Sequence, residues 1–111
     1  YNLAGGGIAS GRMTVALVAA GVVAKQIVSE VRFDCRVVQI GSECDPARFD
    51  DIIAAAERDG DSVGGVIECR VEGVSPLRGE PFFDSVESVM SHLLFSIPAV
   101  KGVEPSRTLH C

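Results

Sequence analysis

The sequence predicts a small α/β chain in which three helices alternate with three strands. Two patterns carry this prediction: three stretches have apolar residues at helical spacing, and the stretches between them are rich in β-branched residues. With 47% hydrophobic and 23% charged residues, the 111 residues are expected to form at most one modest domain with an ordinary core. The alternation is typical of a layered α/β or α+β unit.

The first helix is expected over residues 12–29, after the glycine-rich loop Gly5-Gly-Gly-Ile-Ala-Ser-Gly-Arg-Met-Thr14. Ser10 has a side chain suited to the N-cap. The larger apolar residues recur near the helical repeat, so this helix is apolar on most sides and is expected to be buried in its parent structure. Small residues leave one face without bulk, namely Ala16, Ala19, Ala20, Gly21 and Ala24.

The loop ahead of this helix predicts an anion-binding site. The first-turn N–H groups of a helix have no intrahelical acceptor, and glycines let the backbone approach a ligand closely. Ser10, Arg12 and Thr14 add side-chain donors, and Arg12 could clamp a phosphate or carboxylate with two nitrogens. The alternative is a capped, glycine-led helix with a surface arginine. The loop lacks the Gly-Lys-Ser/Thr of a P-loop and follows no visible strand, as a dinucleotide fingerprint would.

The next two elements are a strand over residues 31–40, ended by Gly41, and a helix over about 45–58. Asp45-Pro46 opens this helix, because aspartate caps the N-terminus and proline suits the first helical position. Asp59-Gly60-Asp61 is expected to stop it and turn the chain.

The second strand is expected over residues 62–74, with Gly64-Gly65 inside it. Paired glycines weaken a strand unless something must approach the backbone closely. Two interpretations stay open: a β-bulge, or a ligand or subunit that passes over the strand.

The C-terminal part begins with a turn-rich connector over residues 75–81. A third helix is expected over 83–95, starting at Asp84 or just after Pro81. Residues 96–103 are expected to return as a final extended strand, with Pro98 near its start because proline cannot donate to a ladder.

Composition excludes several classes of function. A net charge of −5 and a pI near 4.9 argue against nucleic-acid binding, which needs a basic surface. No apolar run is expected to cross a membrane, since residues 15–24 are too few and are flanked by Arg12 and Lys25. No signal peptide is visible, and without an initiator methionine the chain is expected to be a piece of a longer protein.

The chain offers few groups for metal binding or catalysis. Its four cysteines lie far apart without a Cys-x-x-Cys pair, so reduced thiols are expected rather than a metal centre or a disulfide scaffold. His92 is expected to be a polar face residue of the third helix. The carboxylates of Asp59, Asp61 and Glu68 are expected to be solvated. No catalytic residue and no metal ligand is assigned.

Three segments, taken together and in order, resemble the chorismate synthase family. They are Gly5-Gly-Gly-Ile-Ala-Ser-Gly-Arg-Met-Thr14 with Val18-Ala-Ala-Gly-Val-Val-Ala-Lys25, then Gly60-Asp-Ser-Val-Gly-Gly-Val-Ile-Glu68, and Gly79-Glu-Pro-Phe-Phe-Asp84 with Ser96-Ile-Pro-Ala-Val-Lys-Gly-Val-Glu104. The resemblance covers about residues 5–104. It implies that residues 1–111 are a single partial domain from the centre of a longer chain, with a divergent tail over 104–111. The implied fold is part of a layered β-α-β sandwich.

The resemblance also implies a function. Chorismate synthases are lyases that convert 5-enolpyruvylshikimate 3-phosphate to chorismate and phosphate by anti 1,4-elimination, the last step of the shikimate pathway. The family needs reduced FMN and is associated with NADP, and it forms cytoplasmic homotetramers. The partners implied are a phosphorylated small molecule and further copies of the chain, with no nucleic acid and no membrane. The flavin supplies the chemistry, so the task of the protein is positioning and electrostatics.

The family's flavin contacts fall on two short segments of this sequence. A second flavin contact in the family is often made by a neighbouring subunit. By position, the resemblance implies FMN-binding roles for Ile8, Ala9, Ser10 and Arg12 in the loop, and for Pro98 and Ala99 at the second contact.

The sequence departs from the family in three places. Ile8 stands where many relatives have a basic residue, and the tail after Glu104 differs from the family's. The family's two catalytic histidines lie in motifs upstream of this segment, and His92 and His110 match neither. The 111 residues alone are therefore expected to be inactive. The alternative is a non-catalytic anion-binding, flavin-binding or assembly domain that keeps only the fold core.

Overall fold

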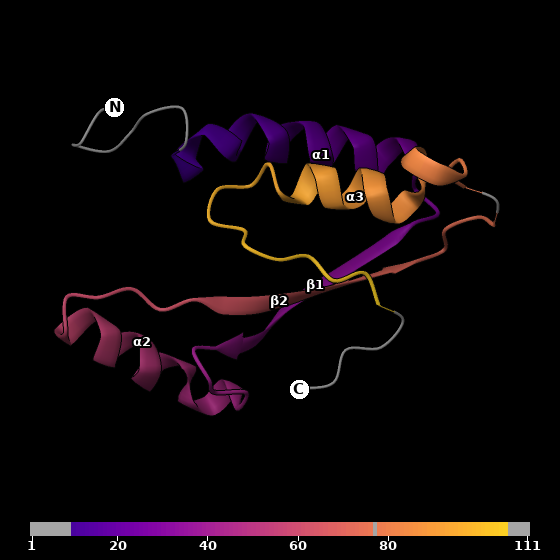
Figure 1. Ribbon diagram of the computed structural model, residues 1–111. Coiled ribbons are helices and arrows are strands. Elements are labelled where there is room, and N and C mark those ends of the chain that lie inside the picture. Colours follow the sequence, from indigo (N-terminus) through magenta and orange to yellow (C-terminus); the bar gives the residue numbers. More distant parts are fainter. Residues whose placement is uncertain (1–9, 77, 107–111) are drawn as a thin grey trace. The chain divides into compact units, whose positions relative to one another are not determined.

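The fold is seen in a computed structural model that describes residues 10–76 and 78–106 (Figure 1). Its helices and strands confirm the α/β (α+β) prediction. The chain divides into two compact units, one containing residues 10–31 and the described part of 73–106, the other residues 32–72. The elements, with 3₁₀ turns labelled η, are η1 (Gly11–Thr14), α1 (Val15–Ile27), β1 (Arg32–Ile40), η2 (Pro46–Arg48), α2 (Phe49–Arg58), β2 (Gly65–Glu72), η3 (Phe82–Asp84) and α3 (Val86–Leu94).

Strands β1 and β2 form a two-stranded antiparallel ribbon whose register separates apolar from charged residues. On the charged face, each cross-strand pair joins opposite charges: Arg32 with Glu72, Asp34 with Arg70, and Arg36 with Glu68. On the apolar face, the pairs are Phe33 with Val71, Cys35 with Cys69, and Val37 with Ile67. A slip of one residue would exchange the two faces, so this pattern fixes the register.

The glycine pair lies where the ribbon ends. The strand predicted over residues 62–74 is shorter in the structure. It is β2, which begins at Gly65, so Gly64 precedes it. A Cβ added to Gly65 would lie 2.7 Å from the carbonyl oxygen of Gln39, whereas one added to Gly64 would meet nothing within 4 Å. The close approach is thus made by β1 itself. The β-bulge lies on β1, between Val37 and Gln39, and not at the glycines.

Helix α2 confirms the prediction for residues 45–58 at both ends. The Asp45 carboxylate accepts a hydrogen bond from the Ala47 N–H at 3.0 Å, with Pro46 at the first position of η2. At the other end Gly60 has a φ of 67°. The N–H groups of Gly60 and Asp61 donate to carbonyls of the last helical turn, which is a Schellman motif.

Helix α1 confirms the helix predicted over 12–29, with η1 as its first turn. Its large apolar side chains are exposed, from 56% for Val22 to 77% for Ile27. None of the described residues of the chain is buried. The burial expected for this helix is therefore not supplied by the residues that the structure describes.

Helix α3 begins later than the predicted 83–95. Its N-cap is Ser85, whose hydroxyl oxygen accepts a hydrogen bond from the Ser88 N–H at 3.2 Å. The start predicted at Asp84 or after Pro81 was wrong, because residues 82–84 form the separate turn η3. The Asp84 carbonyl accepts a hydrogen bond from the Glu80 N–H instead.

The strand predicted over residues 96–103 is also wrong, since the backbone there forms turns and irregular chain. Hydrogen bonds from the N–H groups of Ser96, Ile97 and Val100 to carbonyls three residues earlier make successive turns. Ala99 has a φ of 70°, which an extended strand does not allow. Within the described residues the sheet has two strands, β1 and β2, and residues 96–103 add no third one.

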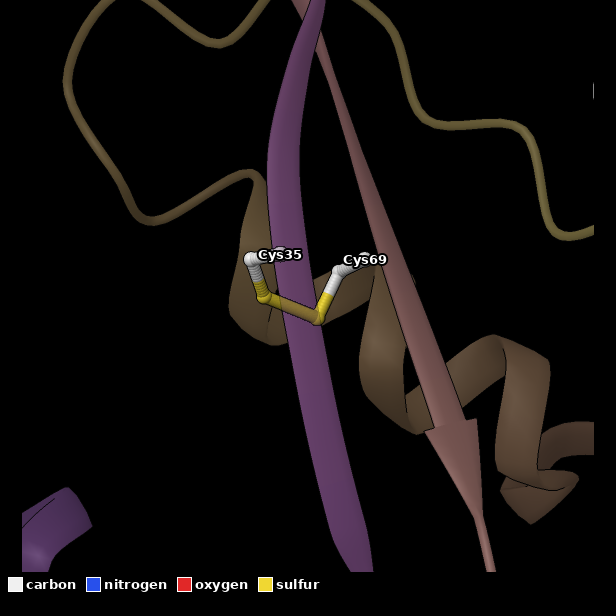
Figure 2. The surroundings of a disulfide bond; sticks show 2 residues. All are labelled: Cys35 and Cys69. Atoms are coloured by element: carbon white, nitrogen blue, oxygen red, sulfur yellow. A yellow bond between two sulfur atoms is a disulfide. The ribbon is translucent and has the colours of Figure 1, made fainter.

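Cys35 and Cys69 form a disulfide across the ribbon (Figure 2). Cys44 is also disulfide-bonded, so the expectation of reduced thiols was wrong for these three residues. Cys35 and Cys69 are 34 positions apart in sequence, and only the antiparallel register brings their Cα atoms to 4.1 Å. Spacing along the sequence does not reveal such a pair.

Candidate anion-binding site

The candidate site begins at the turn that leads into α1. Ser10 has extended backbone (φ −73°, ψ 140°), and its carbonyl accepts the first hydrogen bond of the turn, from the Met13 N–H at 3.0 Å. The N–H groups of Gly11 and Arg12 precede that first donor, so they have no acceptor inside the turn. They are oriented as the N-terminal N–H groups of a helix are, toward a ligand ahead of it.

The charges around this turn favour an anion. Neither η1 nor α1 has an acidic residue in its first turn, so the partial positive charge of the helix start is not compensated there. Arg12 is exposed and has no ion-pair partner among residues 10–76 and 78–106. The Ser10 hydroxyl makes no capping hydrogen bond. Among residues 10–76 and 78–106, no capping bond or ion pair therefore occupies either side chain.

Thr14 has a different role from the one predicted. Its hydroxyl donates to the Gly11 carbonyl at 2.6 Å. Because this bond uses the only proton of the hydroxyl, Thr14 stabilises η1 and cannot also donate to an anion. Ser10 and Arg12 remain as the side-chain donors of the turn.

The second predicted contact, Pro98 and Ala99, lies on the turn after α3. Pro98 is half-buried and Ala99 is exposed with a positive φ. A residue with a Cβ rarely takes this conformation, and such positions cluster at ligand sites.

The structure groups these residues only in part. Ser10 and Arg12 share one turn, Pro98 and Ala99 share another, and both turns belong to the same compact unit. In the part of the chain that the structure describes, no hydrogen bond or ion pair joins the two turns. Ile8 and Ala9 lie outside the described residues.

A second charged cluster, which was not predicted from the sequence, lies on the charged face of the ribbon. The Arg36 guanidinium donates to Glu68 at 2.8 and 3.0 Å, and an Arg70 nitrogen lies 3.6 Å from the same carboxylate. The hydrogen bond from Arg36 lowers the pKa of Glu68, and the same bond raises the pKa of Arg36. Glu68 accepts from Arg36 and lies close to Arg70, so these charges are paired on one face of the ribbon and stabilise it rather than attracting an anion. The alternating charges at 32, 34, 36 and 68, 70, 72 were the signal for it.

The remaining candidate catalytic residues do not lie together in one site. Asp59 and Asp61 flank the C-terminal glycine of α2, whereas Glu68 pairs with Arg36 in the ribbon. His92 is exposed in the last turn of α3. Among the described residues no three metal-ligating side chains gather, and none of the helices there has the length and apolarity needed to cross a bilayer.

Comparison with known proteins identifies relatives over nearly the whole chain. The sequence profile of the family described as chorismate synthase matches residues 1–110. A chorismate synthase of Chitinophaga pinensis is 48% identical over 101 residues, which are 90% of this chain and 30% of that protein. Those of Rhizorhabdus wittichii and Korarchaeum cryptofilum are 37% and 36% identical, over 90% and 94% of this chain and 34% and 36% of their own lengths.

The chain spans about a third of the length of these curated relatives. The alignments with the Rhizorhabdus and Korarchaeum proteins extend over 122 and 131 positions, more than the 111 residues of this chain, so those relatives have additional residues inside the matched segment. No solved structure matches the chain. Because the family's profile covers residues 1–110 in full order, the chain belongs to the chorismate synthase family.

Proposed function

We propose that this chain is the part of a chorismate synthase that holds the phosphate of reduced FMN. The enzyme would convert 5-enolpyruvylshikimate 3-phosphate to chorismate and phosphate by anti 1,4-elimination. The observation that carries the proposal is the family match over residues 1–110, which includes the loop before α1 and the turn at 98–99. Since the chain spans about a third of its relatives, the activity belongs to a protein of their length.

The turn at the start of η1 suits a phosphate monoester. Two backbone N–H groups, of Gly11 and Arg12, have no acceptor in the turn, and the Arg12 guanidinium has no ion-pair partner among the described residues. A Cβ added to Gly11 would meet nothing within 4 Å, so the space beside the backbone there is open. A doubly charged phosphate would receive charge-assisted hydrogen bonds from both sources.

The residues of this chain would bind and orient the flavin, and they would not move protons. Bound reduced FMN supplies an electron-rich flavin beside the substrate. Ser10 and Arg12 would hold its phosphate, with Ile8 and Ala9 next to them in the loop. Ile8, in place of a basic residue, offers no charge there. Pro98 and Ala99 would contact the flavin of a neighbouring subunit, at the turn where Ala99 has a positive φ.

Self-association is part of the proposal. The apolar side chains of α1 are more than half exposed, and an apolar surface of this kind is typical of an interface. We place the protein in a cytoplasmic homotetramer, with NADP connected to the reduction of its flavin. Neither nucleic acid nor a membrane is among its proposed partners.

The first test measures FMN binding to the 111-residue chain by flavin fluorescence. Arg12→Ala is expected to weaken binding by about 10- to 100-fold, the usual value of a charged hydrogen bond, and Ser10→Ala by less. Arg58→Ala is the matched control, because Arg58 is an exposed arginine in the other compact unit. Riboflavin, which lacks the phosphate, should bind equally to the parent chain and to Arg12→Ala. Equal loss of FMN and riboflavin affinity would contradict the phosphate-binding role.

The second test concerns the reaction. The segment of the Chitinophaga pinensis chorismate synthase that matches this chain over 101 residues is replaced by the corresponding residues of this chain. We expect the chimaera to release phosphate from 5-enolpyruvylshikimate 3-phosphate with reduced FMN, and the 111-residue chain alone to release none. A folded chimaera that binds FMN without turnover would favour the alternative, a non-catalytic flavin-binding or assembly domain.

A further inference from the structure

The apolar face of the β1–β2 ribbon contains a disulfide at its centre. We propose that Cys35 and Cys69 form a thiol–disulfide exchange site that small thiols and disulfides of the glutathione class open and close reversibly, while the ribbon keeps its register. This site is independent of the FMN proposal, because both cysteines lie in the compact unit of residues 32–72.

The ribbon holds the two sulfurs together without the bond. Cys35 and Cys69 are directly opposite in the ladder, and their Cα atoms are 4.1 Å apart. On the charged face, three opposite-charge pairs flank the disulfide in register, including Arg36 with Glu68. Each such pair favours the same alignment of the strands. When the disulfide opens, these pairs and the ladder keep the thiols opposite one another.

The disulfide is also accessible to small thiols. Both cysteines are exposed, and the side chains of both leave the ribbon on the same side (Figure 2). A small thiolate can therefore reach either sulfur without breaking a ladder hydrogen bond, and access of this kind controls the rate of exchange. Reduction then changes one covalent bond and leaves the backbone pairing as it was.

The chemical steps balance as two consecutive exchanges. One cysteine thiolate attacks a small disulfide, forms a mixed disulfide and releases one small thiolate. The second cysteine thiolate attacks the protein sulfur of this mixed disulfide, forms the Cys35–Cys69 bond and releases the second small thiolate. The protein loses two electrons and two protons, and the small disulfide gains them as two thiols. The reverse sequence opens the bond.

The experiment measures the fraction of chains that contain the Cys35–Cys69 disulfide as a function of the redox buffer. The 111-residue chain is fully reduced, equilibrated at a series of ratios of reduced to oxidised glutathione, quenched with acid, alkylated and digested with trypsin. A Cys35–Cys69 bond links the tryptic peptides 33–36 and 59–70, whereas Cys44 lies in peptide 37–48, so mass spectrometry distinguishes the pairings. The same series is repeated in concentrated urea.

The linked peptide is expected to appear and disappear reversibly along the series, and to exceed any product that joins Cys44 to Cys35 or Cys69. In urea, closing the pair is expected to need at least about tenfold more oxidising buffer, because the unfolded chain must bring the two cysteines together across the 34-residue separation. Ser42→Ala, a control in the same compact unit that removes no thiol, should change the midpoint by less than about twofold.

Three results would overturn the proposal. The first is a midpoint in urea within tenfold of that in buffer, which would mean that the ribbon does not hold the thiols together. The second is statistical pairing with Cys44. The third is a disulfide that glutathione opens only in urea, which would mean that the folded ribbon protects it.

Discussion

The glycine pair at the start of β2 provides a sharp test of the ribbon, because two adjacent glycines have opposite surroundings. Gly65→Ala places a Cβ 2.7 Å from the carbonyl oxygen of Gln39, and the Cα of Ile40 is 3.8 Å away. Backbone atoms cannot rotate aside as the end of a side chain can. The strands must separate by a few tenths of an ångström at their terminal pair, Ile40 with Gly65.

The expected cost of Gly65→Ala is about 1–3 kcal/mol, the usual range for forcing an extra methyl group into a packed position. Gly64→Ala is the matched control, because its added Cβ meets nothing within 4 Å and its φ lies outside the positive region. That substitution should be neutral or should stabilise by up to about 1 kcal/mol, through the lower entropy of the unfolded chain.

The assay is urea denaturation of the oxidised chain, followed by far-UV circular dichroism, with both variants measured beside the parent. Amide hydrogen exchange of Gly41 adds a local readout, since its N–H donates to the Gly64 carbonyl at 2.8 Å. Faster exchange of Gly41 is expected in Gly65→Ala only. Free energies of unfolding for the two variants that agree within about 0.5 kcal/mol would refute the reasoning, because only the predicted close approach distinguishes them.

Three further predictions concern local interactions. Asp45→Ala should destabilise the chain by about 1 kcal/mol through the lost N-cap of η2, whereas Asp50→Ala, in the first turn of α2, should cost less; urea denaturation compares them. Gly60→Ala should cost about 1–2 kcal/mol because its φ is 67°, and loss of helical signal at a lower urea concentration is the check. The pKa of Glu68 is lowered from 4.5, so its pairing with Arg36 stabilises the fold above that pH and is lost as the pH falls through the lower folded value. The difference in unfolding free energy between the parent and Glu68→Gln should therefore be constant between about pH 6 and 8 and disappear in acid; a difference that persists in acid would contradict the pairing.

The sequence was sufficient to predict features that depend on residues close together in the chain. The cap at Asp45 and the stop at Gly60 follow from residue types at fixed offsets, and both lie where they were predicted. A strand was wrongly predicted over residues 96–103 because the apolar, β-branched residues there suit a strand. A strand also needs an edge to pair with, and turns beginning at Leu93 and Leu94 use the N–H groups that a ladder would need.

Features that depend on residues distant in sequence could be predicted only once the register of β1 and β2 was known. Each strand was predicted from its own composition, but the disulfide and the charge pairs exist only once residues 32–37 face residues 67–72 in antiparallel order. The complementary charges were present in the sequence, so aligning the two strands by charge would have revealed both the ribbon and the Cys35–Cys69 pair.

The exposed surface of α1 connects stability with the candidate site. Ser10 and Arg12 are positioned by η1, which continues into a helix whose apolar side chains are more than half exposed in this chain. An anion site at a helix start depends on N–H groups that are held in place, and a helix of 13 residues without buried contacts is marginally stable in water. FMN should therefore bind more tightly to the chimaera, in which α1 is surrounded by the rest of a chorismate synthase, than to the 111-residue chain. Arg12→Ala should also weaken FMN binding by a larger factor in the chimaera, because the Arg12 guanidinium forms its charged hydrogen bond more fully where the turn is better ordered. Equal affinities in the two proteins would mean that the turn is already fixed by local interactions such as the Thr14 hydrogen bond to Gly11.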